Sequence, residues 1–473
     1  MLRNIIVMKK MNRFYVVSFV LLLISGCYTY SPIPDAVNSS TYTGLNESQQ
    51  KILPVDCKVL TLDIAAQVAV ANNPDYLSMS HSVNAAWSRF YTSLNSYFPV
   101  ITADYGITEN RYTPQNSGGN GTDSQANVVK GGALNANWVI FDGLVREMNM
   151  LAKKHSANQE EFLDKDARRL LVQSVANSYN NVLLARENIR IAEADESFNQ
   201  KLYDETELKY KVGEVSLSEP LNFKVKVNQA KNGLIVAQFN FITAKYVLAS
   251  LLGLTEGDIP SHVDFPPMSS RKYDFAADVS VYLDTALNNR PDLQAYREAL
   301  LAADYTVWSK WGQFLPVISA NGSWGYQRED TGNGMWRNYG SRTQDRSFNY
   351  GITAEWVLFN GGKRYFELQE SQAQLAESQL SVVAKWITVV TEVRQAYENY
   401  RQAVDQVALF EETLTLVQKT RDLVEEEYKA GNAPLTRVNE SQKDLVNAES
   451  NLVNSKINLE NAKAQVDAAT GAN

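Results

Sequence analysis

The chain carries the hexapeptide WVIFDG at residues 138–143 and a near copy, WVLFNG, at residues 356–361. The two copies are 218 residues apart, and further landmarks keep this offset or one residue less. These landmarks are Arg146 with Arg364, Tyr210-Lys211-x-Gly213 with Tyr428-Lys429-x-Gly431, and Pro99-Val100-Ile101 with Pro316-Val317-Ile318. Chance would not preserve one spacing over so many positions. We therefore predict that the chain is a duplication of one structural unit.

Around each hexapeptide the hydrophobic pattern has a period of two, which is typical of strands. Apolar and polar residues alternate from Ile101 and from Ile318, and again over 134–140 and 349–358. A half-buried sheet of a soluble domain would show the same alternation. Aromatic residues on the apolar faces of an exported chain favour a lipid-facing barrel wall instead. We expect four strands in all, two in each copy.

After each hexapeptide the pattern becomes helical up to Val212 and Ala430, which corresponds to about 100 Å of helix. The second stretch has a heptad seam, broken only by Arg421. The seam consists of Val393, Ala396, Tyr400, Ala403, Val407, Phe410, Leu414, Val417, Arg421, Val424 and Tyr428. A bilayer core is about 30 Å thick, so most of each helix must lie outside the membrane.

A turn at Gly213 or Gly431 then leads into a returning helix, with Pro220 or Pro434 near its start. We expect the returning helix over 220–252 and a single helix over 279–313 to stack end to end, matching the length of one long helix. The segment between them contains Pro260, Pro266 and Pro267. We expect it to form a belt around the middle of the helical part.

The N-terminus resembles a secretory signal followed by a lipobox. Four basic residues precede an apolar run, and LISGC at residues 23–27 ends it. The run is too short for a spanning helix of about 20 residues, so export with acylation of Cys27 by palmitate-type chains is favoured over a permanent N-terminal anchor. Cys57 would then be the one remaining thiol, which excludes an intramolecular disulfide, and its role stays open.

The charge of the chain excludes nucleic acid as a partner. Without residues 1–26, 41 basic residues face 53 acidic ones. The three histidines, His81, His155 and His262, have no spacing typical of a metal site or a catalytic triad. We therefore expect no catalytic residue, no cofactor and no metal. A periplasmic coiled-coil scaffold without a pore is the competing class.

Together these motifs resemble those of the TolC-type outer-membrane efflux proteins. The shared motifs are LTLDIA at 60–65, NNPD at 72–75, Phe98-Pro99 before a strand, Trp-x-x-Phe-x-Gly, and Tyr-Lys-x-Gly before a leucine. They run in the same order from Leu60 to Gly471. The resemblance implies a homotrimer, with a twelve-stranded β-barrel continued by a twelve-helix periplasmic α-barrel. A periplasmic adaptor contacts its tips, and an inner-membrane pump supplies it.

The predicted organisation follows from the repeat and the resemblance. It comprises a signal peptide over 1–26, a lipidated linker over 27–59, a first repeat over 60–254, a connector over 255–278 and a second repeat over 279–473. With a lipidated Cys27, the chain resembles the lipoprotein branch of the family, which serves multidrug and metal pumps. The chain would sit in the outer membrane and extend into the periplasm. Drugs, metals and secreted proteins all remain open as cargo.

We expect a gate at the turns Lys211–Glu219 and Lys429–Arg437, the ends farthest from the strands. The residues assigned to it are Gly213, Glu219, Gly431, Arg437 and Glu440. In the resembling family the helix after the second turn carries acidic residues that constrict the pore. Glu440 keeps the acid and Arg437 departs from it. Arg437 is expected either to pair with Glu219 on a neighbouring turn or to contact Glu440 locally, since i and i+3 are neighbours on a helix.

Overall fold

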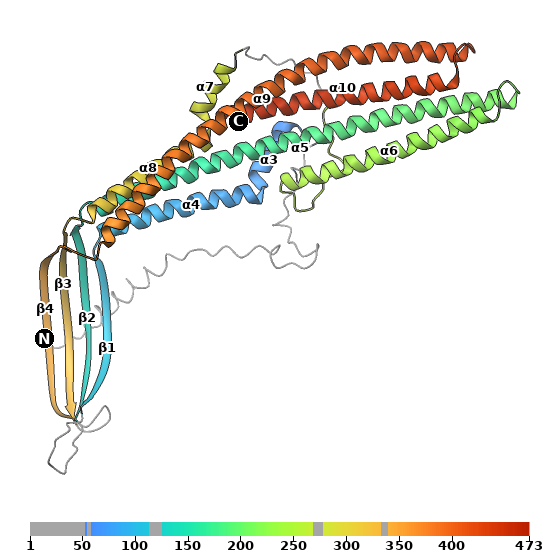
Figure 1. Cartoon of the computed structure of the whole chain (residues 1–473). Coiled ribbons are helices and arrows are strands. Elements are labelled where there is room, and N and C mark those ends of the chain that lie inside the picture. Colours follow the sequence, from blue (N-terminus) through green and yellow to red (C-terminus); the bar gives the residue numbers. More distant parts are fainter. Residues whose placement is uncertain (1–52, 54–57, 113–124, 268–277, 333–338, 473) are drawn as a thin grey trace. The chain divides into compact units, whose positions relative to one another are not determined.

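A computed structural model describes residues 53, 58–112, 125–267, 278–332 and 339–472 (Figure 1). The chain divides into Met1–Ile52 and Leu53–Asn473, and all described residues belong to the second unit. The predicted signal peptide, Cys27 and Cys57 lie outside them.

The second unit alternates helices with two pairs of strands, and apart from the short η3 of the first half the order of elements is the same in both halves. The first half has α3 (Leu62–Asn72), α4 (Pro74–Leu94), η3 (Asn95–Tyr97), β1 (Val100–Tyr112), β2 (Gln125–Phe141), α5 (Val145–Lys211) and α6 (Ser218–Leu251). The second half has α7 (Val279–Asn289), α8 (Pro291–Gly312), β3 (Val317–Gly332), β4 (Tyr339–Glu355), α9 (Lys363–Lys429) and α10 (Leu435–Thr470).

The four predicted strands form one antiparallel sheet in the order β1-β2-β3-β4 (Figure 1). Directly paired residues share a face, so the apolar positions of all four strands fall on one side. The last strand ends earlier than predicted. β4 ends at Glu355, and Trp356 and Leu358 follow it outside the sheet, because that strand lies at the edge and its last residues have no partner strand.

The two long helices, α5 and α9, each have 67 residues and end within a residue of the predicted positions. α5 packs along α6, and α9 packs along α10. The seam predicted on α9 is buried at Val393, Ala396, Tyr400, Ala403 and Val424. Heptad spacing therefore identified the packed face of that helix.

The single helix predicted over 279–313 is wrong, because it is interrupted at Arg290, whose backbone is extended (φ −64°, ψ 119°). Pro291 follows, and the residue before a proline is pushed out of the helical region by clash with the proline ring. The first half breaks in the same way at Asn73, before Pro74.

The end-to-end stacking also differs from the prediction, because each returning helix meets the pre-strand helix of its own half. At the first junction the Asn73 side-chain Nδ2 donates to the Leu251 carbonyl at the end of α6 (3.0 Å). At the second junction the Arg290 guanidinium donates to the Ala469 carbonyl at the end of α10 (3.5 Å). Thus α6 continues into α4 and α10 into α8, and each pair makes a composite helix. The helix breaks make this possible, because they turn α3 and α7 aside.

The proline-marked connector packs against the first half. Leu60 N–H donates to the Asp264 carbonyl (2.8 Å), and Leu60, Ile259 and Phe265 belong to a core that includes Tyr179 of α5. Tyr179 donates its hydroxyl to the Leu60 carbonyl (2.9 Å), and burial raises the pKa of Tyr179 to about 12.

Candidate functional site

The apolar face of the sheet is exposed in the single chain. Five of its large side chains are at least 70% exposed, namely Ile101, Tyr105, Phe348, Tyr350 and Ile352. The opposite face carries short polar residues such as Thr102, Asn135, Asn349 and Thr353. An apolar area of this extent is unstable against water and requires lipid or another protein surface to cover it.

The repeated tryptophan and arginine hold the point where the strands meet the helices. Trp138 donates its indole N–H to the Tyr97 carbonyl (3.0 Å), and Trp356 donates to the Phe314 carbonyl (3.1 Å). Both rings stay largely exposed at the base of the apolar face. A ring that is apolar at one end and bonded at the other suits the boundary between membrane and water.

Arg146 folds back on the end of β2 and donates to the carbonyls of Val139 (2.7 Å) and Ile140 (2.9 Å). Its repeat-mate Arg364 donates to the carbonyls of Gln313 (2.9 Å) and Val357. These bonds satisfy backbone carbonyls where the strands meet the helices, which gives a physical reason for the repeated arginine.

The two helical turns are closed by glycines in the left-handed region. Gly213 has φ +84° and Gly431 has φ +78°, and nothing lies within 4 Å of the position that a Cβ would occupy on either. The backbone angle, and not crowding, therefore demands glycine here. The bonds from Glu214 N to Lys209 O (2.9 Å) and from Asn432 N to Glu427 O (2.8 Å) complete the same helix-ending motif twice.

An apolar cluster joins the two hairpins near these turns. Leu202 and Phe223 of the first hairpin pack with Val424 and Val438 of the second, and the two turns lie at the same end of the helices (Figure 1). Arg421, which interrupts the heptad seam, lies over the Phe198 ring of the other hairpin (5.3 Å).

Tyr428 connects the turns, and the sequence analysis missed it as a partner of Glu219. Its hydroxyl donates to the Glu219 carboxylate (3.3 Å), and its ring contacts Phe223 (6.4 Å between centroids). Burial raises the pKa of Tyr428, and the Glu219 charge acts in the same direction. The repeated Tyr-Lys-x-Gly motif marked the tyrosine, but nothing in the sequence pairs residues 209 positions apart.

The structure places Arg437 and Glu440 in the first turns of α10. Among the ion pairs of residues 58–112, 125–267, 278–332 and 339–472, none joins Arg437 to Glu219 or to Glu440. Within one chain, therefore, Glu219 bonds to Tyr428, and neither expected partner of Arg437 is engaged.

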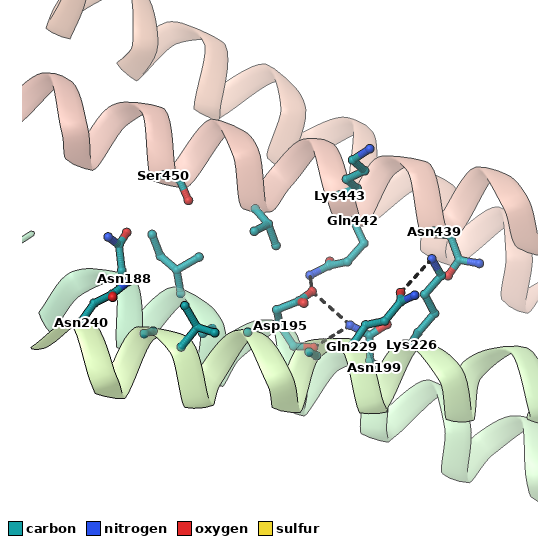
Figure 2. Close-up of a pocket in the computed structure, with 17 residues that line it drawn as sticks. Asn188, Asp195, Asn199, Lys226, Gln229, Asn240, Asn439, Gln442, Lys443 and Ser450 are labelled. Carbon is teal, nitrogen blue, oxygen red and sulfur yellow. Dashed lines mark hydrogen bonds between the residues drawn. The ribbon is translucent and has the colours of Figure 1, made fainter. Parts of the chain in front are cut away.

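A polar groove of about 470 Å³ lies between α5, α6 and α10 (Figure 2). Asp195 lies at its centre and accepts from Gln442 (2.8 Å) and Asn199 (3.1 Å). Amide side chains, Lys226, Lys443 and apolar residues such as Val236 and Val446 line the rest. The carboxylate is held in a hydrogen-bond network between the two hairpins, so this arrangement fixes their packing.

The histidines are separated in space. His155 lies 2.8 Å from the Glu298 carboxylate and stacks on Tyr305, while His81 and His262 lie on other elements. In the described part of the chain, no three His, Cys, Asp or Glu side chains group in a way that could hold a metal ion.

The model of the outer membrane efflux protein family matches residues 65–254 and 282–472. The chain therefore belongs to the outer membrane efflux protein family, as the sequence resemblance to TolC-type proteins predicted. The outer membrane efflux protein BepC of Brucella suis is 24% identical over 321 residues, which span 67% of this chain and 64% of BepC.

Solved structures share the fold. The Campylobacter jejuni CmeC outer membrane channel superimposes with a TM-score of 0.72 at 18% identity, over 87% of this chain and 85% of CmeC. CusC, whose structures concern folding and transmembrane channel formation, superimposes with a TM-score of 0.73 at 18% identity, over 94% of this chain and 98% of CusC. The Neisseria gonorrhoeae MtrE channel, solved in its open state, superimposes with a TM-score of 0.69 at 18% identity, over 87% of this chain and 88% of MtrE.

Proposed function

We propose that this protein is the outer-membrane channel subunit of a tripartite efflux system, a passive duct for small molecules. The observation that carries the proposal is the sheet, with one exposed apolar face, one polar face, and two edge strands that each have a single partner. A bilayer cannot satisfy the backbone groups of an open edge. Family membership and the channel folds of CmeC and MtrE support the same function.

Three copies would close the sheet into a barrel of twelve strands. Each chain would also supply two long helices and two composite helices, so a trimer would continue the barrel with twelve helical rods. α6 supports this assembly. It is the one helix of the described residues that is long and apolar enough to cross a bilayer by composition, yet only 17% of its most apolar window is buried. In the trimer a neighbouring subunit would cover that surface.

The two matched halves correspond to the proposed repeats over 60–254 and 279–473, with the connector over 255–278 as a belt segment. A periplasmic adaptor would contact the helical turns and receive cargo from an inner-membrane pump. Export of proteins through the same duct is the alternative cargo. Acylation of Cys27 would anchor the chain beside the barrel, and loss of palmitate labelling in Cys27→Ser tests it.

Conductance and mass together test the channel. The full-length protein, purified in mild detergent, should have the mass of three chains and form discrete channels in planar lipid bilayers. A monomer with no conductance and intact helix content would instead identify a periplasmic scaffold. Crosslinking in cells, followed by identification of the copurifying pump, would separate small-molecule efflux from protein secretion.

The gate is proposed at the two turns, formed by Gly213, Glu219, Gly431, Arg437 and Glu440. Arg437 would pair with Glu219 on a neighbouring turn, at the carboxylate that also accepts from Tyr428 of its own chain. Exposed pairs contribute only about 0–1 kcal/mol each, so three copies would bias the entrance toward closure without locking it.

Single-channel recording of Arg437→Glu tests the latch, since repulsion from Glu219 should widen the resting entrance and raise conductance. Charge reversal also changes ion selectivity, so Glu219→Arg combined with Arg437→Glu is the control and should restore the wild-type level. Unchanged conductance in the single variant, or no restoration in the double variant, would exclude the latch.

A further inference from the structure

The basic residues of the sheet all lie on its apolar face. Four lysines and arginines have described side chains in the strands, and the register places every one of them on that face: Lys130, Arg328, Arg342 and Arg346. The acids are divided between the two faces: Asp104, Glu329, Asp345 and Glu355 lie on the opposite face, and Glu109 and Asp330 lie on the apolar face. The described basic side chains are confined to one face although the protein as a whole has a net charge of −8.

These four residues also share one end of the sheet. The row formed by Leu134, Trp324 and Phe348 is apolar. The next row away from the helices pairs Tyr326 with Arg346, the following one pairs Lys130 with Arg328, and the last pairs Asp330 with Arg342. Directly paired side chains are about 5 Å apart at Cβ, and diagonal ones about 7–8 Å. The residues therefore form one basic cluster, which borders the apolar band at the end opposite the helices.

A buried carboxylate holds part of the cluster in place. Asp330 has no exposed side-chain surface, and its Oδ1 accepts from the Nε of Arg328 (3.1 Å) and the Nε of Arg342 (3.0 Å). The two arginine side chains are 30% and 54% exposed. Asp330 thus holds both guanidinium groups in place beside the apolar band, while part of their surface stays accessible.

This placement identifies a ligand chemistry. With the helices in the periplasm, the cluster lies at the level of the outer-leaflet headgroups and faces lipid, away from the duct. Guanidinium groups present paired donors that match phosphate oxygens, and a fixed guanidinium loses less entropy on binding. The outer leaflet of a Gram-negative outer membrane presents the phosphates of lipopolysaccharide at this level.

We infer that Lys130, Arg328, Arg342 and Arg346 bind the phosphate groups of outer-leaflet lipopolysaccharide. Three clusters around a trimer would fix the height of the barrel in the membrane. The inference rests on the proposed function only in taking the sheet as a barrel wall whose strand ends opposite the helices face the exterior.

The experiment uses the full-length protein in detergent and measures binding of bisphosphorylated lipid A by native mass spectrometry. Dephosphorylated lipid A and phosphatidylglycerol are the comparison lipids. The first variant, Lys130→Gln with Arg346→Gln, leaves the Asp330 pairs intact. The second, Arg328→Gln with Asp330→Asn and Arg342→Gln, removes the buried charge together with its partners and so avoids an unpaired carboxylate. Arg394→Gln with Arg401→Gln, two exposed arginines of α9, is the matched control.

Each cluster variant should weaken lipid A binding by about tenfold or more, as expected for losing charge-assisted hydrogen bonds, and the control should bind like wild type. Equal binding of dephosphorylated lipid A would overturn the inference in favour of ordinary apolar contact. Equal binding of phosphatidylglycerol would replace it with an unselective anionic surface. Conductance in bilayers of phospholipid alone reports on the channel separately, so its loss in the wild type would count against the proposed function and not against the cluster.

Discussion

The two junctions between returning and pre-strand helices have the same geometry but different chemistry. At the first junction the neutral side-chain amide of Asn73 makes both hydrogen bonds. Its Nδ2 donates to the Leu251 carbonyl, and its Oδ1 accepts from the Tyr76 N–H (3.1 Å). At the second junction Arg290 stands in the place of Asn73, and it is 1% exposed.

Arg290 makes a two-point contact with Asp292 (3.0 and 2.6 Å), and Lys385 of α9 approaches the same carboxylate (2.7 Å). Arg169 of α5 lies 4.0 Å from Asp292 and donates to the Ala468 carbonyl (2.7 Å). The second junction therefore links α8, α9, α10 and α5 through buried charge. One backbone arrangement can therefore be held by a local cap or by a buried ionic network, but only the network is strongly destabilised when one of its partners is removed.

Removing the carboxylate of the network should have the largest effect. Asp292→Asn leaves Arg290 paired only with the half-exposed Glu392 and removes the carboxylate that Lys385 contacts, which costs about 3 kcal/mol. Amide hydrogen exchange of the full-length protein should show this loss of protection at the start of α8 and the end of α10. A loss below about 1 kcal/mol would mean that the network is not what holds the second junction.

Low pH should destabilise the second junction more than the first without any substitution, though by less than Asp292→Asn does. Burial would raise the pKa of Asp292, but hydrogen bonds from Arg290 and Lys385 outweigh it and hold the pKa well below its usual range. A depressed folded pKa stabilises the fold above the unfolded value of about 4, and that stabilisation is lost as the pH falls toward the folded pKa.

Exchange at the second junction should therefore accelerate more below pH of about 4 than exchange at the first. In Asp292→Asn this additional pH dependence should disappear. Parallel pH profiles at both junctions of the wild type would contradict the assignment.

A smaller effect is expected at the first junction. Asn73→Ala removes a helix cap and one bond between helices, which together cost about 1–2 kcal/mol. Faster exchange should be confined to the start of α4 and the end of α6. Asn73→Asp keeps the cap but turns a carboxylate oxygen toward the Leu251 carbonyl, so its effect at the end of α6 should be at least as large as that of Asn73→Ala.

The smallest effect is predicted for Asp75→Asn. Asp75 is the repeat-mate of Asp292, but it is exposed, so the change should stay within about 0.5 kcal/mol. The same substitution at equivalent positions of the two halves thus tests directly whether burial and partners set the difference. An effect as large as that of Asp292→Asn would show that burial and partners do not set the difference between the two positions.

Periodicity predicted the sheet and the long helices because both patterns are strong and local. The alternation from Ile101 identified the apolar face of the sheet, and the seam from Val393 identified the buried face of α9. The helix breaks at Asn73 and Arg290 were missed although Pro74 and Pro291 are visible, since a proline in the first turn fits a continuing pattern as well as a new helix.

The contacts of the candidate sites could not be predicted, because they join distant residues. Tyr428 meets Glu219 only when two hairpins pack, and Lys130 lies opposite Arg328 only in the register of β2 and β3. Sequence identified Gly213 and Gly431 because left-handed backbone angles leave few other choices.

The composite helices also constrain how this chain reaches its native state. Asn73 binds Leu251, which lies 178 positions later in the chain, and Arg290 binds Ala469, which lies 179 positions later. In each case a strand pair and a long helix are synthesised between the two partners. Folding that depends on such separated contacts is slow, since the entropy of closing the loop must be overcome before the contact stabilises anything. During that interval the apolar strands of each half are complete but unsupported at their base. The chain therefore passes through an aggregation-prone interval twice, once for each half.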